Sequence, residues 1–246
     1  VPSNSVGMSD PTTVKLKALT DKLSTVASTN EELAKSSNYV CLAVKPQVLP
    51  AVLPTLRGPL AENDNPVLVT MAAGTKTETI CKLLGKEYPV IRIMPNTPCS
   101  IGAGVILVTG NHLVTEEQLH TFIYDFSACG KLVQVEKEEW IDSGSVISGC
   151  GPAYIYMYIE AMAKAGEALG LPYDTAAELA KATCRGAAML SEQSPVSLED
   201  LRIAVCSPGG STIEGVKSLQ ESDLNGTVEK ALTAAYDRTL ELAKDN

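Results

Sequence analysis

The feature that most constrains the fold is a change of periodicity near residue 135. Before it, short runs of β-branched and apolar residues alternate with amphipathic stretches, whereas the chain after it has a helical pattern throughout. Short, almost continuously apolar runs are typical of strands in a parallel sheet that helices cover on both faces. We therefore predict a doubly wound α/β domain over residues 1–135 and an all-α domain over residues 136–246.

The alternation in the first half predicts individual strands and helices. Capping boxes that begin at Thr29 and Thr115 each indicate the start of a helix. The apolar segment 46–56 contains Pro50 and Pro54, so we expect it to be short, kinked or irregular. The strands are expected at 39–44, 67–71, 90–94, 104–109 and 131–135, with further helices at 12–23 and 75–84.

The second half begins with an expected helix over 152–169 that is apolar on nearly all sides in its first two turns. A helix of this kind is buried, and a chain this small buries it most easily against a second copy. Gly170 ends it. Later helices are expected from Asp174 or Thr175 to about Glu192, from about Ser197, from a capping box over 211–214, and over 224–243.

Charge and composition exclude several classes of function. The chain has 246 residues and a formal net charge of −9, and all of this excess lies after residue 135. An acidic surface argues against nucleic-acid and anionic-membrane partners. Two histidines are too few for most zinc-hydrolase or Ser/His/Asp sites, and no metal site is predicted. Seven scattered cysteines without CxxC spacing favour a reducing compartment, so we expect a cytoplasmic location.

The segment from Ser207 to Thr212, with the sequence SPGGST, is a candidate anion site. Its proline fixes one φ angle, its two glycines relax the next positions, and a helix follows at once. Free backbone N–H groups at a helix N-terminus suit a carboxylate or a phosphate. The same pattern is also typical of an ordinary tight turn before a capped helix.

Three further candidates follow predicted strands, at the sheet edge where ligands bind in open α/β folds. Asn96 and Thr97 lie on a proline-stiffened loop, Lys45 follows another strand, and small residues up to Gly74 end a third. Ordinary turns would show the same placement. Cys150 is not expected to be a nucleophile, because no histidine follows residue 120 to activate it.

Five stretches of the chain together resemble the pyrroline-5-carboxylate reductase family, in the family's order and spacing from about Val6 onward. They are AVKPQ (43–47), MAAG (71–74), RIMPNTP (92–98), SGCGPAYIYMYIEAMAKAG (148–166) and SPGGST (207–212). The resemblance implies hydride transfer from NADPH or NADH to the imine carbon of 1-pyrroline-5-carboxylate, which gives L-proline. It also implies a Rossmann-type domain, a helical dimerisation domain, and assembly of dimers into decamers.

The resemblance assigns roles to individual residues. Thr212 would hydrogen-bond the substrate nitrogen and is the candidate catalytic residue. Glu192 occupies the place of an acidic residue near the substrate ring. The substrate carboxylate would rest on Ser207, Gly209 and Gly210. The cofactor would contact Ser9, Ala43, Val44, Lys45, Pro46, Ala72, Ala73, Gly74, Asn96 and Thr97.

The chain departs from the family at its start. The family begins with a strand and a GxGxxG/A-type loop that holds the pyrophosphate, and we expect about 25–30 residues of this first β-α unit to be missing here. Residues 6–10 would then be the second strand, whose end reads the adenosine ribose. Ser9 suits a 2′-phosphate, but Asp10 would repel one, so the choice between NADPH and NADH stays open.

Two alternatives remain. A related β-hydroxyacid dehydrogenase would need a lysine as acid and base on the helix after the domain junction, and Lys164 lies more than two turns inside its helix. A non-enzymatic scaffold without a phosphate loop is the other. Imine reduction fits the residues better, because hydride transfer requires alignment more than a nucleophile and a protonated imine is already electrophilic.

Overall fold

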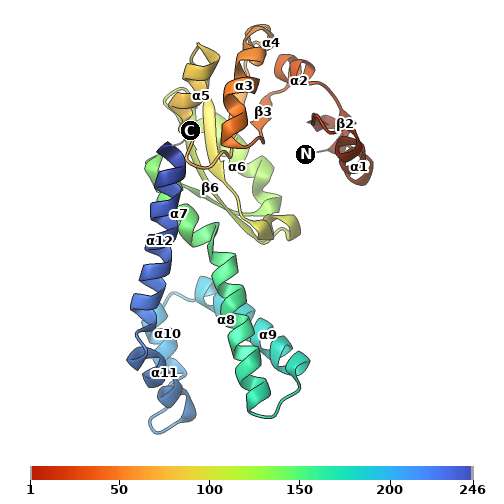
Figure 1. Cartoon of the computed structure of the whole chain (residues 1–246). Helices are drawn as coiled ribbons and strands as arrows, with labels where there is room; N and C mark the ends of the chain where they lie inside the picture. Colours follow the sequence, from red (N-terminus) through yellow and green to blue (C-terminus); the bar gives the residue numbers. More distant parts are fainter. Residues whose placement is uncertain (1, 245–246) are drawn as a thin grey trace. The chain divides into compact units, whose positions relative to one another are not determined.

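The computed structural model describes residues 2–244 and divides into two compact units (Figure 1). Unit 1 comprises the chain up to Gly149 together with the segment from Tyr236 onward, and unit 2 comprises Cys150–Ala235. No helix among the described residues is both long enough and apolar enough to span a membrane. The α/β-then-helical organisation predicted from the periodicity is confirmed.

Unit 1 is built on a five-stranded sheet with the order β3-β4-β5-β6-β7. Each strand lies within two residues of its predicted bounds. β3 ends earliest relative to the prediction, because the Ala43 N–H turns back to the Cys41 carbonyl at 3.1 Å. The strands are β3 (Tyr39–Leu42), β4 (Val67–Thr70), β5 (Val90–Met94), β6 (Gly104–Gly110) and β7 (Gly130–Gln134).

The sheet is mixed rather than wholly parallel. β3, β4 and β5 run parallel, β6 is antiparallel to β5, and β7 is parallel to β6. The connection from Met94 to Gly104 holds only the short 3₁₀ helix Thr97–Ile101. A parallel neighbour needs a crossover of roughly a dozen residues or more, so this short connection returns the chain in the opposite direction.

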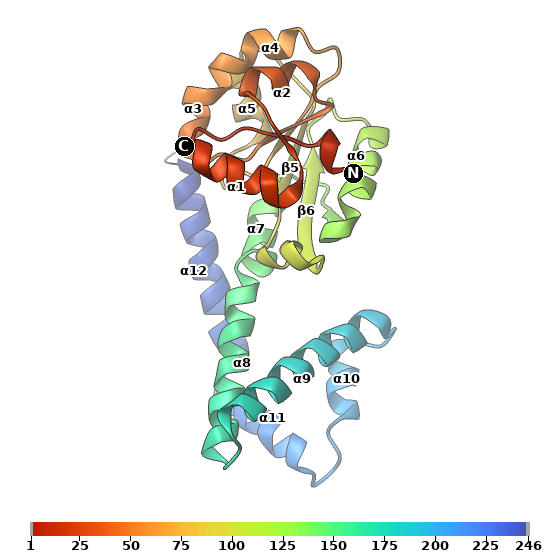
Figure 2. The ribbon, with the colours of Figure 1, turned by 90° about the vertical axis from the view of Figure 1, so that its right-hand side faces the viewer.

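Helices cover both faces of this sheet (Figure 2). On one face Leu68 and Val90 pack with residues of the helices before and after β4, and on the other Val69 and Ile91 pack against Phe122 of α6. The 46–56 segment is irregular as predicted, with 3₁₀ turns on both sides of a single helical turn. The helices are α2 (Asn30–Ser36), α3 (Leu49–Val52), α4 (Arg57–Ala61), α5 (Thr77–Leu84) and α6 (Glu116–Phe126).

The first residues of unit 1 form a small separate sheet. β1 (Gly7–Met8) pairs in parallel with β2 (Val26–Ala27), and the predicted helix α1 (Thr13–Leu23) connects them. The strand expected over residues 6–10 is therefore present, although it pairs outside the five-stranded sheet.

Unit 2 is helical throughout, as predicted. Its helices are α8 (Gly151–Ala168), α9 (Tyr173–Gln193), α10 (Leu198–Ala204), α11 (Ser211–Glu221) and the first part of α12 (Leu224–Lys244). Ser197 caps α10 as expected. The predicted cap of α9 at Asp174 or Thr175 is wrong, because Pro172, which has no backbone N–H and a φ already near the helical value, leads directly into the helix at Tyr173.

The division into compact units falls later than the domain boundary predicted at residue 135. The reason is α7 (Glu139–Ser148), which packs against β5 and β6 rather than with the later helices. Ile141 of this helix is completely buried. Compactness therefore assigns α7 to unit 1, although its sequence continues the helical pattern of the second half.

Candidate active site

The three parallel strands of unit 1 bring the predicted cofactor residues to one edge of the sheet. β3, β4 and β5 are neighbours in register, so the segments that follow them emerge side by side at their carboxyl ends. These segments are Ala43–Pro46, Ala72–Gly74 and Asn96–Thr97. In open α/β sheets this is the edge at which dinucleotides bind.

The segment after β3 presents a cation at this edge. Lys45 is exposed, and its backbone carbonyl accepts a hydrogen bond from the Val48 N–H at 2.9 Å, which fixes the start of the 3₁₀ turn that begins at Pro46. Ala43 is exposed and Val44 half-buried. An anionic group that lies along this edge would therefore meet the lysine side chain and little steric bulk.

The segment after β4 is a tight turn that small residues make possible. The Thr75 N–H donates to the Ala72 carbonyl at 3.2 Å, and Gly74 adopts a φ of 67° in the left-handed region. A side chain at Gly74 would be strained there. Ala72 is buried, and Ala243 of α12 fills the space that a side chain at Gly74 would need. Ala73 is exposed, so a flat ligand can approach the turn on the side of this residue.

Asn96 has a structural function that the sequence did not reveal. Its amide Nδ2 donates to the carbonyl of Ser148 at 3.0 Å, and its Oδ1 accepts from the Val105 N–H at 2.9 Å. The side chain thus connects the end of β5 to the last residue of α7 and to β6. Because the backbone of the protein occupies the amide of Asn96, the exposed Thr97 next to it is the residue of this pair that a ligand can reach.

Ser9 lies apart from these three segments, directly after β1 in the small sheet, and it is exposed. The neighbouring carboxylate of Asp10 accepts a hydrogen bond from the Thr12 N–H at 2.8 Å and lies 3.4 Å from the Lys15 ammonium. The Thr12 N–H, followed by Lys15, lowers the pKa of Asp10. The carboxylate that was expected to repel a 2′-phosphate therefore has a cation beside it.

A buried ion-pair network centred on Arg92 of β5 was not predicted from the sequence. Arg92, in the middle of β5, is completely buried and directs its guanidinium at Asp142 of α7, with Nη2–Oδ1 2.5 Å and Nη1–Oδ2 3.4 Å. Its Nη1 also lies 3.5 Å from Glu138 Oε1. A lone arginine inside an apolar strand was the available signal, because a buried charge requires a partner. Spacing alone could not name partners 46 and 50 residues later.

The SPGGST segment in unit 2 forms the predicted turn before α11, but the predicted capping box is wrong. The Gly210 N–H donates to the Ser207 carbonyl at 3.0 Å, and Gly209 has a φ of 72°. This turn makes Gly210 the N-cap residue, so Ser211 is already helical and no side chain caps the helix at this position. The first N–H groups of α11, including that of Thr212, are therefore left to other acceptors.

Apart from Gly210, the residues of unit 2 that were predicted to bind the substrate are exposed, as is the lysine of the alternative enzyme class. Glu192 is exposed on the last turn of α9, and Ser207, Gly209 and Thr212 are exposed. Lys164, the lysine that a hydroxyacid dehydrogenase would use, is exposed and pairs with Glu160 at 2.6 Å. That carboxylate raises the pKa of Lys164, which opposes a role as a base.

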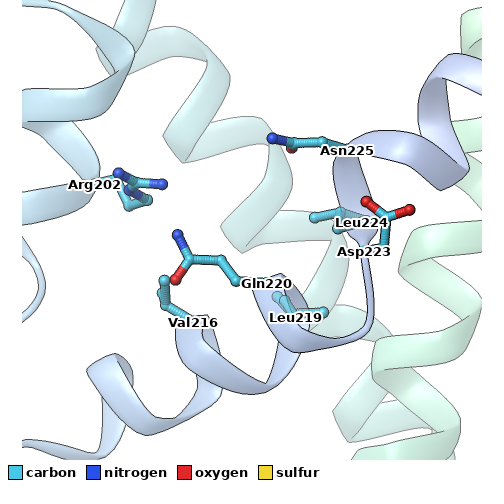
Figure 3. A pocket seen from close by; sticks show the side chains of 7 residues that line it. All are labelled: Arg202, Val216, Leu219, Gln220, Asp223, Leu224 and Asn225. Carbon is cyan, nitrogen blue, oxygen red and sulfur yellow. The ribbon is translucent and has the colours of Figure 1, made fainter.

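A hollow of about 380 Å³ lies at the far end of α11 from this turn (Figure 3). Arg202 and Gln220 point toward each other across it, and Asn225 lies on its other side. None of the predicted site residues lines it, and no group of three or more His, Cys, Asp or Glu residues that could hold a metal ion is found between residues 2 and 244. The lining residues are Arg202, Val216, Leu219, Gln220, Asp223, Leu224 and Asn225.

Comparison with known proteins identifies the family. A family model described as pyrroline-5-carboxylate reductase dimerisation matches residues 138–242, and one described as NADP oxidoreductase, coenzyme F420-dependent, matches residues 3–74. A pyrroline-5-carboxylate reductase from Pisum sativum is 38% identical over 219 residues, which cover 89% of this chain and 79% of the pea protein. The chain belongs to the pyrroline-5-carboxylate reductase family.

Solved structures of this reductase family share the fold over nearly the whole chain. A pyrroline-5-carboxylate reductase from Coxiella burnetii has a TM-score of 0.90 and 34% identity, and the match covers 98% of this chain and 89% of that one. A pyrroline carboxylate reductase from Plasmodium falciparum, solved with NADP bound, has a TM-score of 0.85 and 28% identity, with coverage of 98% and 88%. The Rossmann-type domain and the helical dimerisation domain implied by the resemblance are thus both present.

Proposed function

We propose that this protein is a pyrroline-5-carboxylate reductase, which transfers a hydride from NADPH or NADH to the imine carbon of 1-pyrroline-5-carboxylate and forms L-proline. Membership of the family carries this proposal, because reductases at 38% and 34% identity match 89% and 98% of this chain, respectively. The reaction completes proline biosynthesis.

The residues of the strand edge suit a dinucleotide. Lys45 offers an ammonium to the pyrophosphate, while Ala43, Val44 and Pro46 flank it. The turn that Gly74 makes possible exposes the small Ala73, which leaves room on its side for the flat nicotinamide ring. Thr97 supplies a hydroxyl, and Asn96 holds the loop in place. The bound cofactor supplies the hydride, so the protein need supply only alignment.

Ser9 would lie toward the adenosine ribose. Because Lys15 partly compensates the charge of Asp10, this segment tolerates a 2′-phosphate better than its sequence indicated. We therefore propose that both NADPH and NADH are accepted.

The uncapped N-terminus of α11 suits the substrate. Ser207, Gly209 and Gly210 form a turn whose following N–H groups have no side-chain acceptor at the N-cap, and a carboxylate is the natural partner for such groups. Thr212, one residue inside the helix, would then orient the imine nitrogen with its exposed hydroxyl. Glu192 would favour the protonated, more electrophilic form of the imine through its negative charge.

The test is oxidation of NADPH or NADH by the protein as its gene encodes it, dependent on pyrroline-5-carboxylate. We expect Thr212→Ala to lower kcat/KM about 10- to 100-fold and Thr212→Ser, which keeps the hydroxyl, to retain most of the activity. Turnover with neither cofactor would contradict the proposed function. Full activity of Thr212→Ala would contradict only the role of Thr212.

We also propose that the protein works as a dimer through its helical domain, with further assembly into a decamer, and that it works in the cytoplasm. The dimerisation family model and the exposed apolar side chains of α8, among them Tyr156 and Met157, support self-association. The mass in solution at several protein concentrations distinguishes a dimer from a decamer.

A further inference from the structure

Glu138 connects three elements of unit 1 through a single carboxylate. It is the N-cap residue of α7, its Oε1 accepts from the Thr77 backbone N–H at 2.7 Å, and its Oε2 accepts from the Thr77 hydroxyl at 3.1 Å. The same Oε1 lies 3.5 Å from Nη1 of Arg92 in β5. Glu138 thus joins β5 and α7 to the first residue of α5.

Helix α5 relies on this distant carboxylate for its cap. Its own N-cap residue, Lys76, makes no side-chain capping bond, although the first N–H groups of a helix require acceptors. An anion is favourable at this position because of the helix dipole. The acceptor is supplied from 61 residues further along the chain.

The charges of the network show that Glu138 is not needed to neutralise Arg92. Asp142 faces both terminal nitrogens of the guanidinium, at 2.5 and 3.4 Å, whereas Glu138 faces one of them at 3.5 Å. Two carboxylates therefore surround one buried cation. The second negative charge is compensated by the N-terminus of α5, which is where Glu138 makes its shortest bond.

The turn after β4 lies directly before this helix. Thr77 follows Gly74 by three residues, and at the other end the Ala72 N–H donates to the buried Thr70 hydroxyl at 3.3 Å. The segment between β4 and α5 is thereby held at both ends, once by its own strand and once by Glu138. Ala243 of α12 also lies against Gly74, so loss of the carboxylate would release the Thr77 end of the segment and leave this contact in place.

We propose that Glu138 is a positioning residue for the nicotinamide cofactor: by capping α5 from α7, it holds the Ala72–Gly74 turn in the conformation that the cofactor contacts. This inference rests on the proposed function, in which that turn borders the nicotinamide. It assigns Glu138 an effect on cofactor affinity in addition to its effect on stability.

The experiment compares Glu138→Ala with wild type by titration of NADPH and NADH and by steady-state kinetics. We expect the Kd and KM for the cofactor to rise about tenfold, because charge-assisted hydrogen bonds to the helix start are lost. The kcat at saturating cofactor and the KM for pyrroline-5-carboxylate should stay within about twofold. Glu138→Gln keeps an acceptor oxygen for the Thr77 N–H and should recover part of the affinity.

A cap elsewhere in unit 1 provides the matched control. Thr115→Ala removes the side-chain cap of α6 and should lower Tm with no change in cofactor Kd. A Glu138→Ala protein that loses stability but binds cofactor like wild type would overturn the inference. If Glu138→Ala does not fold, Glu138→Gln and Thr77→Val carry the test, and unchanged affinity in both would overturn it. A wild-type protein that binds neither cofactor would instead contradict the proposed function.

Discussion

The two compact units bury their apolar side chains in different ways. Unit 1 has two extensive clusters, one on each face of the sheet, with Leu68 and Ile91 fully buried in them. Unit 2 has one small cluster of three alanines, while Tyr156 and Met157 of α8 are 60% and 68% exposed. The difference shows that unit 1 encloses its own core, whereas the helices of unit 2 present apolar surface that a partner would cover.

The units also treat charge differently. Unit 1 buries an arginine with two acidic partners, whereas ion pairs on the helices of unit 2, such as Arg202–Glu199 and Lys217–Glu214, are exposed. The chain is acidic after residue 135, yet the proposed substrate is an anion. Its attraction must therefore come from local backbone N–H groups at the start of α11 rather than from long-range charge.

The largest effect is expected from removing the buried cation of unit 1. Arg92→Leu leaves the Asp142 carboxylate without its guanidinium partner, while Glu138 keeps its bonds to Thr77. Breaking such a buried pair costs about 3–5 kcal/mol of unfolding free energy. Arg202→Leu is the control in unit 2, where an exposed pair at 3.3 Å contributes about 0–1 kcal/mol. Denaturant unfolding at one fixed protein concentration measures both. Equal losses of unfolding free energy in the two variants would mean that the buried ion pair of unit 1 contributes no more to stability than the exposed pair of unit 2.

A charge on the exposed face of α8 should act on assembly rather than on folding of the chain. We expect Met157→Asp to weaken self-association by about 2–3 kcal/mol, roughly a 100-fold rise in the dissociation constant, because burying an unpaired carboxylate is costly. Val14→Asp is the control, since Val14 is 82% exposed on α1 of unit 1 and should leave association unchanged. Sedimentation analysis over a range of concentrations measures both. A Met157→Asp protein that associates like wild type would exclude this face of α8 from the interface.

Local sequence signals predicted much of this architecture. Buried strands such as 90–94 were found because their apolar runs are continuous, and the irregular 46–56 segment because its prolines exclude a regular helix. The motifs at the strand ends also come together as expected, since parallel neighbouring strands end at a common edge.

What could not be predicted depends on contacts between distant residues. The amide of Asn96 was expected to meet a ligand, but the backbone of Ser148, 52 residues later, takes its Nδ2. Likewise, nothing near Thr77 in sequence indicates that Glu138 caps its helix. The antiparallel direction of β6, in contrast, was predictable from the sequence. The connection before this strand is too short for the crossover that a parallel strand requires.

The smallest expected change in unfolding free energy concerns two capping-box patterns, one in each unit, only one of which caps its helix. Thr115 with Gln118 and Ser211 with Glu214 both fit a capping box, but only Thr115 is an N-cap, while Ser211 follows the N-cap residue Gly210.

We expect Thr115→Ala to cost about 1 kcal/mol of unfolding free energy, because the Gln118 N–H loses its acceptor. Ser211→Ala, at the first helical position of α11, should cost less than about 0.5 kcal/mol. Thermal and denaturant unfolding of the two variants at the same concentration provide the comparison. A loss at Ser211 as large as that at Thr115 would show that Ser211 caps α11 after all. The N–H groups proposed to receive the substrate carboxylate would then already have an acceptor within the chain.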